Sequence, residues 1–161
     1  MKPLFVVLLA FAVLLAACKK KDDHHAGHTV KDGEHRCANC GMATDLYPEW
    51  EQKVISEDKG TMYFDGARCM FKILLDSLTT PQKIEKILVK DYYTQEYIDG
   101  TKAFYVIGSD VLGPMGRELI PFATEEAAQQ FSTEHQGEKI VLFNEVDMDL
   151  IVRLIGKMKM K

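Results

Sequence analysis

Apolar side chains recur at helical spacing between residues 67 and 78, at positions i, i+3, i+4, i+7, i+8 and i+11. This spacing predicts a helix whose buried face consists of Ala67, Met70, Phe71, Leu74, Leu75 and Leu78. Asp65 stands just before the helix, where a carboxylate can cap the free backbone N–H groups. Pro81 follows the helix and indicates that it has ended by then.

Segments rich in β-branched and aromatic residues lie on both sides of this helix. Residues 46–56 and 61–64 predict two strands, with Lys59 and Gly60 available for the turn between them. Residues 87–93 predict a third strand after the helix. The first half of the chain therefore has the order β-β-α-β.

The same order recurs after residue 100. The expected elements are strands at residues 103–107 and 118–122, a helix from Thr124 to Gly137, a strand at residues 140–143 and a C-terminal helix at residues 147–160. Thr124 suits the N-cap of its helix, and the acidic residues that follow favour the positive helix end. We therefore predict an α+β fold in which two similar β-β-α-β units pack together and a C-terminal helix follows.

The N-terminal residues have the layout of an export signal. A short positive start precedes an apolar run of 14 residues at positions 4–17, which is too short for an ordinary transmembrane helix. The sequence Leu15-Ala16-Ala17-Cys18 resembles the bacterial lipobox. Residues 1–17 are thus expected to be a lipoprotein signal peptide, with Cys18 acylated and anchored in the lipid bilayer. The alternative is a cleaved export signal that ends beside an incidental cysteine.

Residues 18–35 are polar and charged, and we expect them to form a flexible tether. The tether contains three closely spaced histidines, His24, His25 and His28. They form either a short metal-binding tract or ordinary polar linker residues. The start of the tether resembles tails that direct some lipoproteins to the bacterial cell surface. The expected metal-binding domain then spans residues 36–161, with one unit at residues 36–95 and the second, including the last helix, at residues 96–161.

Charge and cysteine usage narrow the function. The formal net charge of −4 does not suggest nucleic acid as a partner. An exported protein enters an oxidising compartment, where free thiols need a reason to stay free. Apart from Cys18, the chain contains Cys37, Cys40 and Cys69. Because three is an odd number, at least one thiol is unpaired or all three serve one metal.

Two thiols and a thioether lie within six residues, in Cys37-Ala38-Asn39-Cys40-Gly41-Met42. Sulfur donors are soft and select Cu(I), zinc or iron–sulfur centres, and zinc sites rarely use methionine. The motif therefore predicts a Cu(I) site. The alternative is that the two cysteines form a disulfide or half of a zinc knuckle while Met42 begins the core.

A second thioether lies in Gly113-Pro114-Met115-Gly116, a tight connection in which a methionine is not needed for core packing. Alone, Met115 suits a residue that covers the end of a sheet, but together with Cys40 and Met42 it predicts a shared copper site. Cys69 falls in the first turn of the predicted helix. It is either a ligand whose pKa the helix end lowers or a small buried hydrophobe.

Several of these motifs together resemble the NosL family of nitrous oxide reductase accessory lipoproteins. They are the lipobox, the Cys37–Met42 motif, Phe64-Asp65-Gly66 with Cys69-Met70 after it, Pro114-Met115-Gly116, and the segment from Phe122-Ala123 to Phe131. The resemblance covers essentially all of the chain after the signal. It implies a membrane-anchored Cu(I) chaperone built from two similar β-β-α-β units, in an arrangement akin to part of organomercurial lyase.

The resemblance also implies ligands and partners. Cys40, Met42 and Met115 match the positions expected to hold Cu(I), and Cys37 is included with them. Further candidates are Cys69, Asp65, His24, His25 and His28. The copper would pass, without catalysis, to an ABC-type maturation complex and so to nitrous oxide reductase. The expected location is the outer membrane, facing the periplasm or exposed at the cell surface.

Two other classes of function stay open. Cys37 and Cys40 can be read as a redox dithiol, or Cys69 with Asp65 as a site that acts on an organometal. Against the dithiol, the C-x-x-C motif does not open a thioredoxin-like βαβ pattern, and Gly41 begins a helix poorly. In the third class, the cysteines and a tether histidine hold structural zinc while the domain binds a partner.

Overall fold

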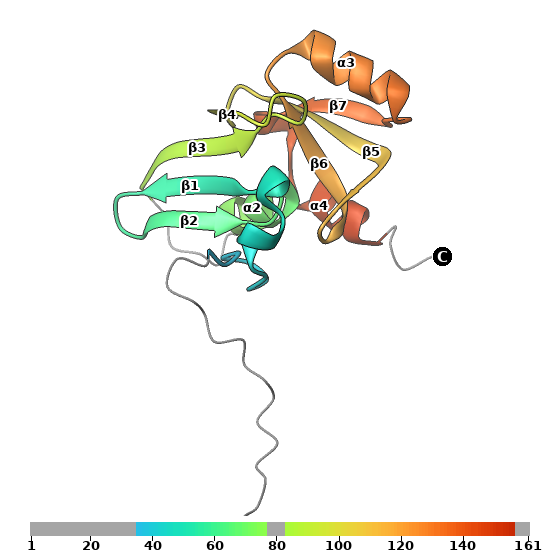
Figure 1. Cartoon of the computed structure of the whole chain (residues 1–161). Helices are drawn as coiled ribbons and strands as arrows, with labels where there is room; N and C mark the ends of the chain where they lie inside the picture. The colour runs from blue at the N-terminus through green and yellow to red at the C-terminus, as the bar shows by residue number, and fades with distance from the viewer. Residues whose placement is uncertain (1–34, 77–82, 157–161) are drawn as a thin grey trace, which may run out of the picture. The chain divides into compact units, whose positions relative to one another are not determined.

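The computed structural model describes residues 35–76 and 83–156. Their elements, in chain order, are η1 (Thr44–Leu46), η2 (Pro48–Trp50), β1 (Gln52–Ser56), β2 (Gly60–Phe64), α2 (Ala67–Leu75), β3 (Ile84–Lys90), β4 (Tyr97–Asp99), β5 (Phe104–Gly113), β6 (Gly116–Phe122), α3 (Glu125–Glu134), β7 (Lys139–Leu142), η3 (Phe143–Glu145) and α4 (Met148–Gly156). Figure 1 shows α3 at one end of the folded part, and α2 and α4, which contact each other, away from it.

The strands form two antiparallel sheets with matching topology. The first has the strand order β2-β1-β3-β4, and the second has the order β6-β5-β7. In each, two strands form a hairpin, a helix follows, and the next strand pairs with the first strand of the hairpin. This confirms the predicted α+β fold with two similar β-β-α-β units, and β4 extends the first sheet by one strand that the sequence pattern did not predict.

The larger hydrophobic core joins the two halves, because α2 contacts β1 and β2 of its own sheet and also β6 of the other. Met70 and Phe71 on the inner face of α2 are fully buried. The Phe71 ring meets Tyr105 of β5 edge-on, with 5.1 Å between the ring centroids. A smaller core lies under α3 around Phe122 and Phe131. The helical spacing that predicted α2 therefore identifies the element that connects the sheets.

The segment before β1 differs from the prediction. Residues 46–50 were expected to begin a strand but form parts of the 3-10 turns η1 and η2. Pro48 opens η2, where its missing N–H costs nothing because that position has no hydrogen-bond partner in the turn. Tyr92 and Tyr93 also lie in a turn, since the Asp91 carboxylate accepts the Tyr93 backbone N–H at 3.1 Å.

The start of α2 also corrects the prediction. The N-cap is Gly66, not Asp65, and no side chain of the N-cap residue accepts a helical N–H. The N–H of Arg68 instead donates to Glu118 Oε1 of β6 at 2.5 Å. Burial raises the pKa of Glu118 to about 7, opposed by its hydrogen bonds and by the Arg68 guanidinium. A residue from the second unit thus satisfies the first helical turn of the first unit.

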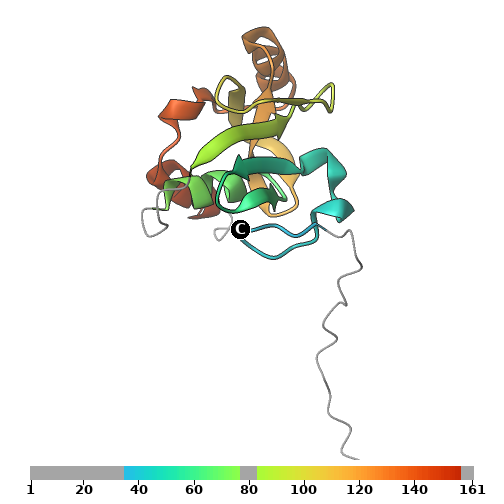
Figure 2. The same cartoon turned by 90° about the vertical axis from the view of Figure 1, so that its left-hand side faces the viewer.

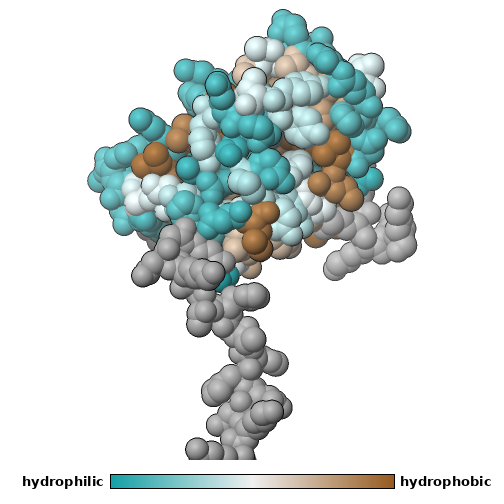
Figure 3. All heavy atoms as spheres, in the orientation of Figure 1, coloured by the Kyte–Doolittle hydropathy of each residue, from teal (hydrophilic) through white to brown (hydrophobic). Residues whose placement is uncertain are grey.

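Several predictions fall on residues outside those described. They are the signal peptide at residues 1–17, acylated Cys18, the tether up to residue 34, Leu78, Pro81 and the end of the last helix beyond Gly156. Among the described residues, no helix is both long enough and apolar enough to cross a bilayer. On the face drawn in Figure 3, hydrophilic surface separates small apolar areas from one another.

The close approach of Glu118 to Gly66 makes a testable prediction. A Cβ at Gly66 would overlap the Glu118 carboxylate, so Gly66→Ala should lower the free energy of unfolding by about 1–3 kcal/mol. Gly156→Ala is the matched control, because nothing lies within 4 Å of a Cβ there, and it should leave stability unchanged or slightly higher. Equal stability of the two variants in urea unfolding would contradict this account of the α2 N-terminus.

Candidate metal centre

A short closed loop positions two of the cysteines. Arg36 and Ala43 form an isolated antiparallel bridge, and the Cys37 N–H donates to the Met42 carbonyl at 2.8 Å. Gly41, at φ +77°, makes the tight turn that a side chain would strain. The Ala38 N–H then donates to the Tyr63 carbonyl of the edge strand β2 at 2.8 Å. The loop is therefore fixed to the sheet, and Figure 2 shows it at the end of the domain away from α3.

Four candidate ligands converge where this loop meets the start of α2. The Sγ of Cys37 donates to Asp65 Oδ1 at 3.0 Å, and the Sγ of Cys40 donates to Asp65 Oδ2 at 3.2 Å. Together with Cys69, their ligand atoms all lie within 4.8 Å of one another. Cys37, Cys69 and Asp65 are buried, whereas Cys40 is exposed. The group is therefore a largely buried thiol cluster with one accessible member.

Hydrogen bonds among the thiols of the cluster shift their pKa values. A hydrogen bond from Cys69 lowers the pKa of the Cys37 thiol, and the same interaction, with burial, raises that of Cys69. Cys37 can thus either donate to Asp65 as a thiol or accept from Cys69 as a thiolate. Although Cys40 is exposed, partial desolvation of its sulfur raises its pKa to about 12. The metal-free cluster therefore favours one thiolate, at Cys37.

The accessible side of the cluster opens into a cavity of about 240 Å³. Its lining consists of Asn39, Cys40, Arg68, Cys69, Lys72, Met115 and Ile155. Two cysteines of the first unit and a methionine of the second unit thus line the same cavity. Arg68 and Lys72 place basic side chains beside the same cavity.

Met115 reaches the cavity from the turn between β5 and β6. Gly116, at φ +90°, belongs to this turn, and Met115 is 36% exposed. The buried Arg68 donates from Nη2 to the Met115 carbonyl at 2.5 Å. This hydrogen bond holds the turn to α2 beside the cavity. The thioether is therefore both accessible and tied to the helix that carries Cys69.

The structure treats the predicted ligands differently. It brings Cys37, Cys40, Asp65 and Cys69 together and places Met115 at the same cavity. Met42 is partly buried and packs against the larger core, which agrees with the alternative reading that this residue begins the core. All three cysteines among the described residues are free, so no disulfide forms there. The histidines His24, His25 and His28 lie outside the described residues.

Sequence reasoning missed two residues of this site. Asn39 Nδ2 donates to Cys69 Sγ at 3.2 Å, and Arg68 ties down the Met115 turn. The position of Asn39 between two candidate ligands of the C-x-x-C motif was a usable signal, because its amide can donate to a nearby sulfur. Arg68 gave no such signal, since a basic residue in the first turn of a helix is usually solvated.

The fold and this thiol cluster define a candidate soft-metal-binding domain of the α+β class. The chain belongs to the NosL family, whose model matches residues 29–151. A curated relative, the copper-binding lipoprotein NosL of Stutzerimonas stutzeri, is 26% identical over 155 residues, which cover 92% of this chain and 80% of the relative.

Two solved structures are similar to this chain. The crystal structure of the copper chaperone NosL from Shewanella denitrificans is similar with a TM-score of 0.65 and 23% identity, covering 71% of this chain and 91% of that one. The solution structure of apo-NosL from Achromobacter cycloclastes has a TM-score of 0.45 and 21% identity, covering 62% of this chain and 87% of that one. At its identity, the Shewanella match shows a shared fold.

The hydrogen bond between Cys69 and Cys37 predicts a pH dependence. The reduced, metal-free protein should ionise one thiol below the ordinary pKa of cysteine, seen as ultraviolet thiolate absorbance during a pH titration. Cys69→Ala removes the donor, so this midpoint should rise, and Cys37→Ser should abolish the low-pH step. An unchanged midpoint in Cys69→Ala would show that another group lowers the Cys37 pKa.

Proposed function

We propose that this chain is a Cu(I) metallochaperone of the bacterial cell envelope, with copper as its cargo and no catalytic reaction. The observation that carries the proposal is the convergence of Cys40, Cys69 and Met115 on one open cavity, above the buried Cys37 and Asp65. The relatives named copper-binding lipoprotein and copper chaperone support the same metal for this chain.

The donor set favours Cu(I) over zinc. Cu(I) has a closed d shell and accepts two or three sulfur donors in varied geometry, whereas structural zinc takes four ligands in a closed tetrahedron. A methionine at the rim adds a donor that suits copper and contributes little to a zinc site. Thioethers also bind without losing a proton, so Met115 remains a ligand at any pH.

The residues have distinct expected roles. Cys40 and Met115 are exposed and would receive and release the ion. Met42 would become a third ligand if its side chain turned from the core towards the loop. Cys69 and Cys37 lie deeper and would supply thiolate when the ion is stored. Asp65 accepts hydrogen bonds from the thiols of Cys37 and Cys40 in the metal-free state, which holds both sulfurs at the site and favours their protonated forms until an ion displaces the protons.

This graded arrangement supports delivery. Transfer by ligand exchange needs an incoming donor to reach the ion before the outgoing one leaves, so at least one ligand must be accessible. Cys40 and Met115 meet that need, and a cage of buried thiolates would not. We further propose that acylated Cys18 anchors the chain in the outer membrane and that the copper passes through an ABC-type maturation complex to nitrous oxide reductase.

Structural zinc is the second candidate function. Three thiols and a carboxylate within 4.8 Å of one another provide the four donors that a closed zinc site requires. In that case zinc would be held by Cys37, Cys40, Asp65 and Cys69, and Met115 would be irrelevant to binding. The two candidates therefore differ in the role of the thioether.

Removal of the thioether tests the proposed function. Met115→Leu keeps the volume of the side chain but deletes its sulfur, so the Cu(I) affinity should fall by at least about tenfold, or about 1.4 kcal/mol. Affinity is measured anaerobically by competition with a Cu(I) chelator. Thermal unfolding of the metal-free protein should not change, because Met115 is exposed.

Met148→Leu is the matched control, since Met148 packs against the core and lies outside the cavity lining. It should bind Cu(I) like the parent chain. If Met115→Leu binds Cu(I) as tightly as this control, or if Zn(II) displaces Cu(I) at equal concentration, the copper-chaperone proposal fails and structural zinc replaces it.

Delivery to nitrous oxide reductase is tested in cells that produce the reductase but lack their own NosL. Expression of this chain should raise the copper content of the purified reductase, and Cys40→Ser should remove most of that gain because the accessible thiolate is lost. Leu112→Ala, an exposed change near the same turn, is the control and should retain the gain. A copper content independent of Cys40 would contradict this route.

A further inference from the structure

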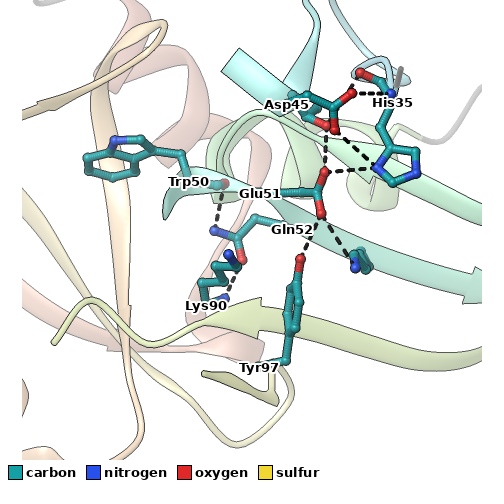
Figure 4. A network of polar contacts seen from close by, with 9 residues as sticks. His35, Asp45, Trp50, Glu51, Gln52, Lys90 and Tyr97 are labelled. Atoms are coloured by element: carbon teal, nitrogen blue, oxygen red, sulfur yellow. Dashed lines mark hydrogen bonds and ion pairs between the residues drawn. The ribbon is translucent and has the colours of Figure 1, made fainter. Parts of the chain in front are cut away.

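A second group of metal-ligating side chains lies where the loop that carries Cys37 and Cys40 begins and ends. This loop, closed by the bridge between Arg36 and Ala43, is called the sulfur loop below. His35 precedes the loop, Asp45 lies in η1, and Glu51 directly precedes β1. One ligand atom from each lies within 4.8 Å of the other two. Figure 4 shows the three side chains pointing toward one another.

The spacing of these atoms matches that of ligands around one ion. His35 Nδ1 is 3.3 Å from Glu51 Oε2 and 3.4 Å from Asp45 Oδ1. Bonds of about 2.0–2.1 Å in a tetrahedral site place neighbouring ligand atoms about 3.3–3.4 Å apart. The two contacts of the imidazole therefore have the length expected between neighbouring ligands of one ion.

The surroundings hold two of the ligands in place. The His35 ring stacks on Tyr63 of β2, with 3.7 Å between centroids and 8° between planes. Glu51 is buried, and its Oε1 accepts the Tyr97 hydroxyl at 2.7 Å. Its Oε2, which faces His35, accepts the Thr44 hydroxyl at 2.6 Å. Such outer hydrogen bonds orient ligands in natural metal sites.

The chemistry of the donors sets the class of ion. One imidazole nitrogen and two carboxylate oxygens suit Zn(II) and similar divalent ions, and they suit Cu(I) poorly. Lys53 Nζ lies 3.4 Å from Glu51 Oε1. One ammonium group offsets only one of the two carboxylate charges, so a divalent ion would meet net negative charge. The side chains of His35 and Asp45 are 37% and 42% exposed, which leaves a path for the ion and for water as a fourth ligand.

We propose that His35, Asp45 and Glu51 form a binding site for a divalent ion of the Zn(II) class, separate from the thiol cluster. The Thr44 N–H donates to the His35 carbonyl at 2.8 Å, so the site lies where the two ends of the sulfur loop come together. A bound ion would join both ends of that loop to the start of β1. The site stands on its own donors and does not depend on the identity of the metal at the cysteines.

The test follows the proposed ligand atom, His35 Nδ1, directly. The full chain, with His24, His25 and His28 changed to Ala and uniformly labelled with ¹⁵N, is titrated with Zn(II) while the imidazole ¹⁵N resonances are followed. His35 Nδ1 should show a saturable shift on binding. Asp45→Asn, a change at an exposed side chain, should weaken the Zn(II) affinity seen at His35 by at least about tenfold while the amide spectrum stays folded.

The molecule contains a matched internal control. His135 Nδ1 lies 3.1 Å from Asp110 Oδ1, so this histidine also contacts a carboxylate. Among the described residues, however, His135 belongs to no group of three or more side chains that could hold a metal ion. Its resonance should not move in the zinc range that saturates His35, and Asp110→Asn should leave the His35 response intact. If the His35 resonance stays in place while zinc fills the thiol cluster, or if both histidines shift in parallel, the proposed site does not exist.

Discussion

Glu118 of β6 accepts the backbone N–H of Arg68 at 2.5 Å, and this buried hydrogen bond connects the two halves of the molecule at the first turn of α2. The free N–H groups of a helix start, together with the helix dipole, favour negative charge nearby. Glu118, Asp65 just before the helix and Cys69 within its first turn are all placed there. The start of one nine-residue helix thus brings Asp65 and Cys69 of the site next to Glu118 of the second unit.

The same turn connects the sulfur donors of the two units. Asp65 accepts the thiols of the loop that precedes β1, and Arg68 holds the carbonyl of Met115 from the hairpin of the second unit. Met115 can therefore share a cavity with Cys40 although 75 residues separate them in sequence. Because the loop and the hairpin are both held at the start of α2, the site depends on the fold and not on the C-x-x-C motif alone.

The sequence predicted the parts of this arrangement that local pattern determines. Helical spacing identified α2, the recurrence of strand, cap and helix identified the repeat, and the sulfur chemistry of Cys40 and Met115 identified two residues that do line one cavity. Local patterns predicted the structure wrongly where a residue distant in sequence determines the conformation. Asp65 stands where the sequence predicts an N-cap, but its carboxylate accepts thiols 25 and 28 residues away, and Glu118 of the second unit accepts the N–H of Arg68 instead. Residues 46–50 have strand-like composition, yet Pro48 and the neighbouring turns bring Asp45 and Glu51 towards His35 instead.

We propose that sulfur from both halves of the chain holds the copper. This is tested most directly by X-ray absorption at the copper edge of the full chain loaded anaerobically with one equivalent of Cu(I). The nearest neighbours of the copper should be sulfur atoms, with fewer of them in Cys40→Ser and in Met115→Leu. A first shell of nitrogen and oxygen, or a sulfur shell that neither variant changes, would contradict the proposal.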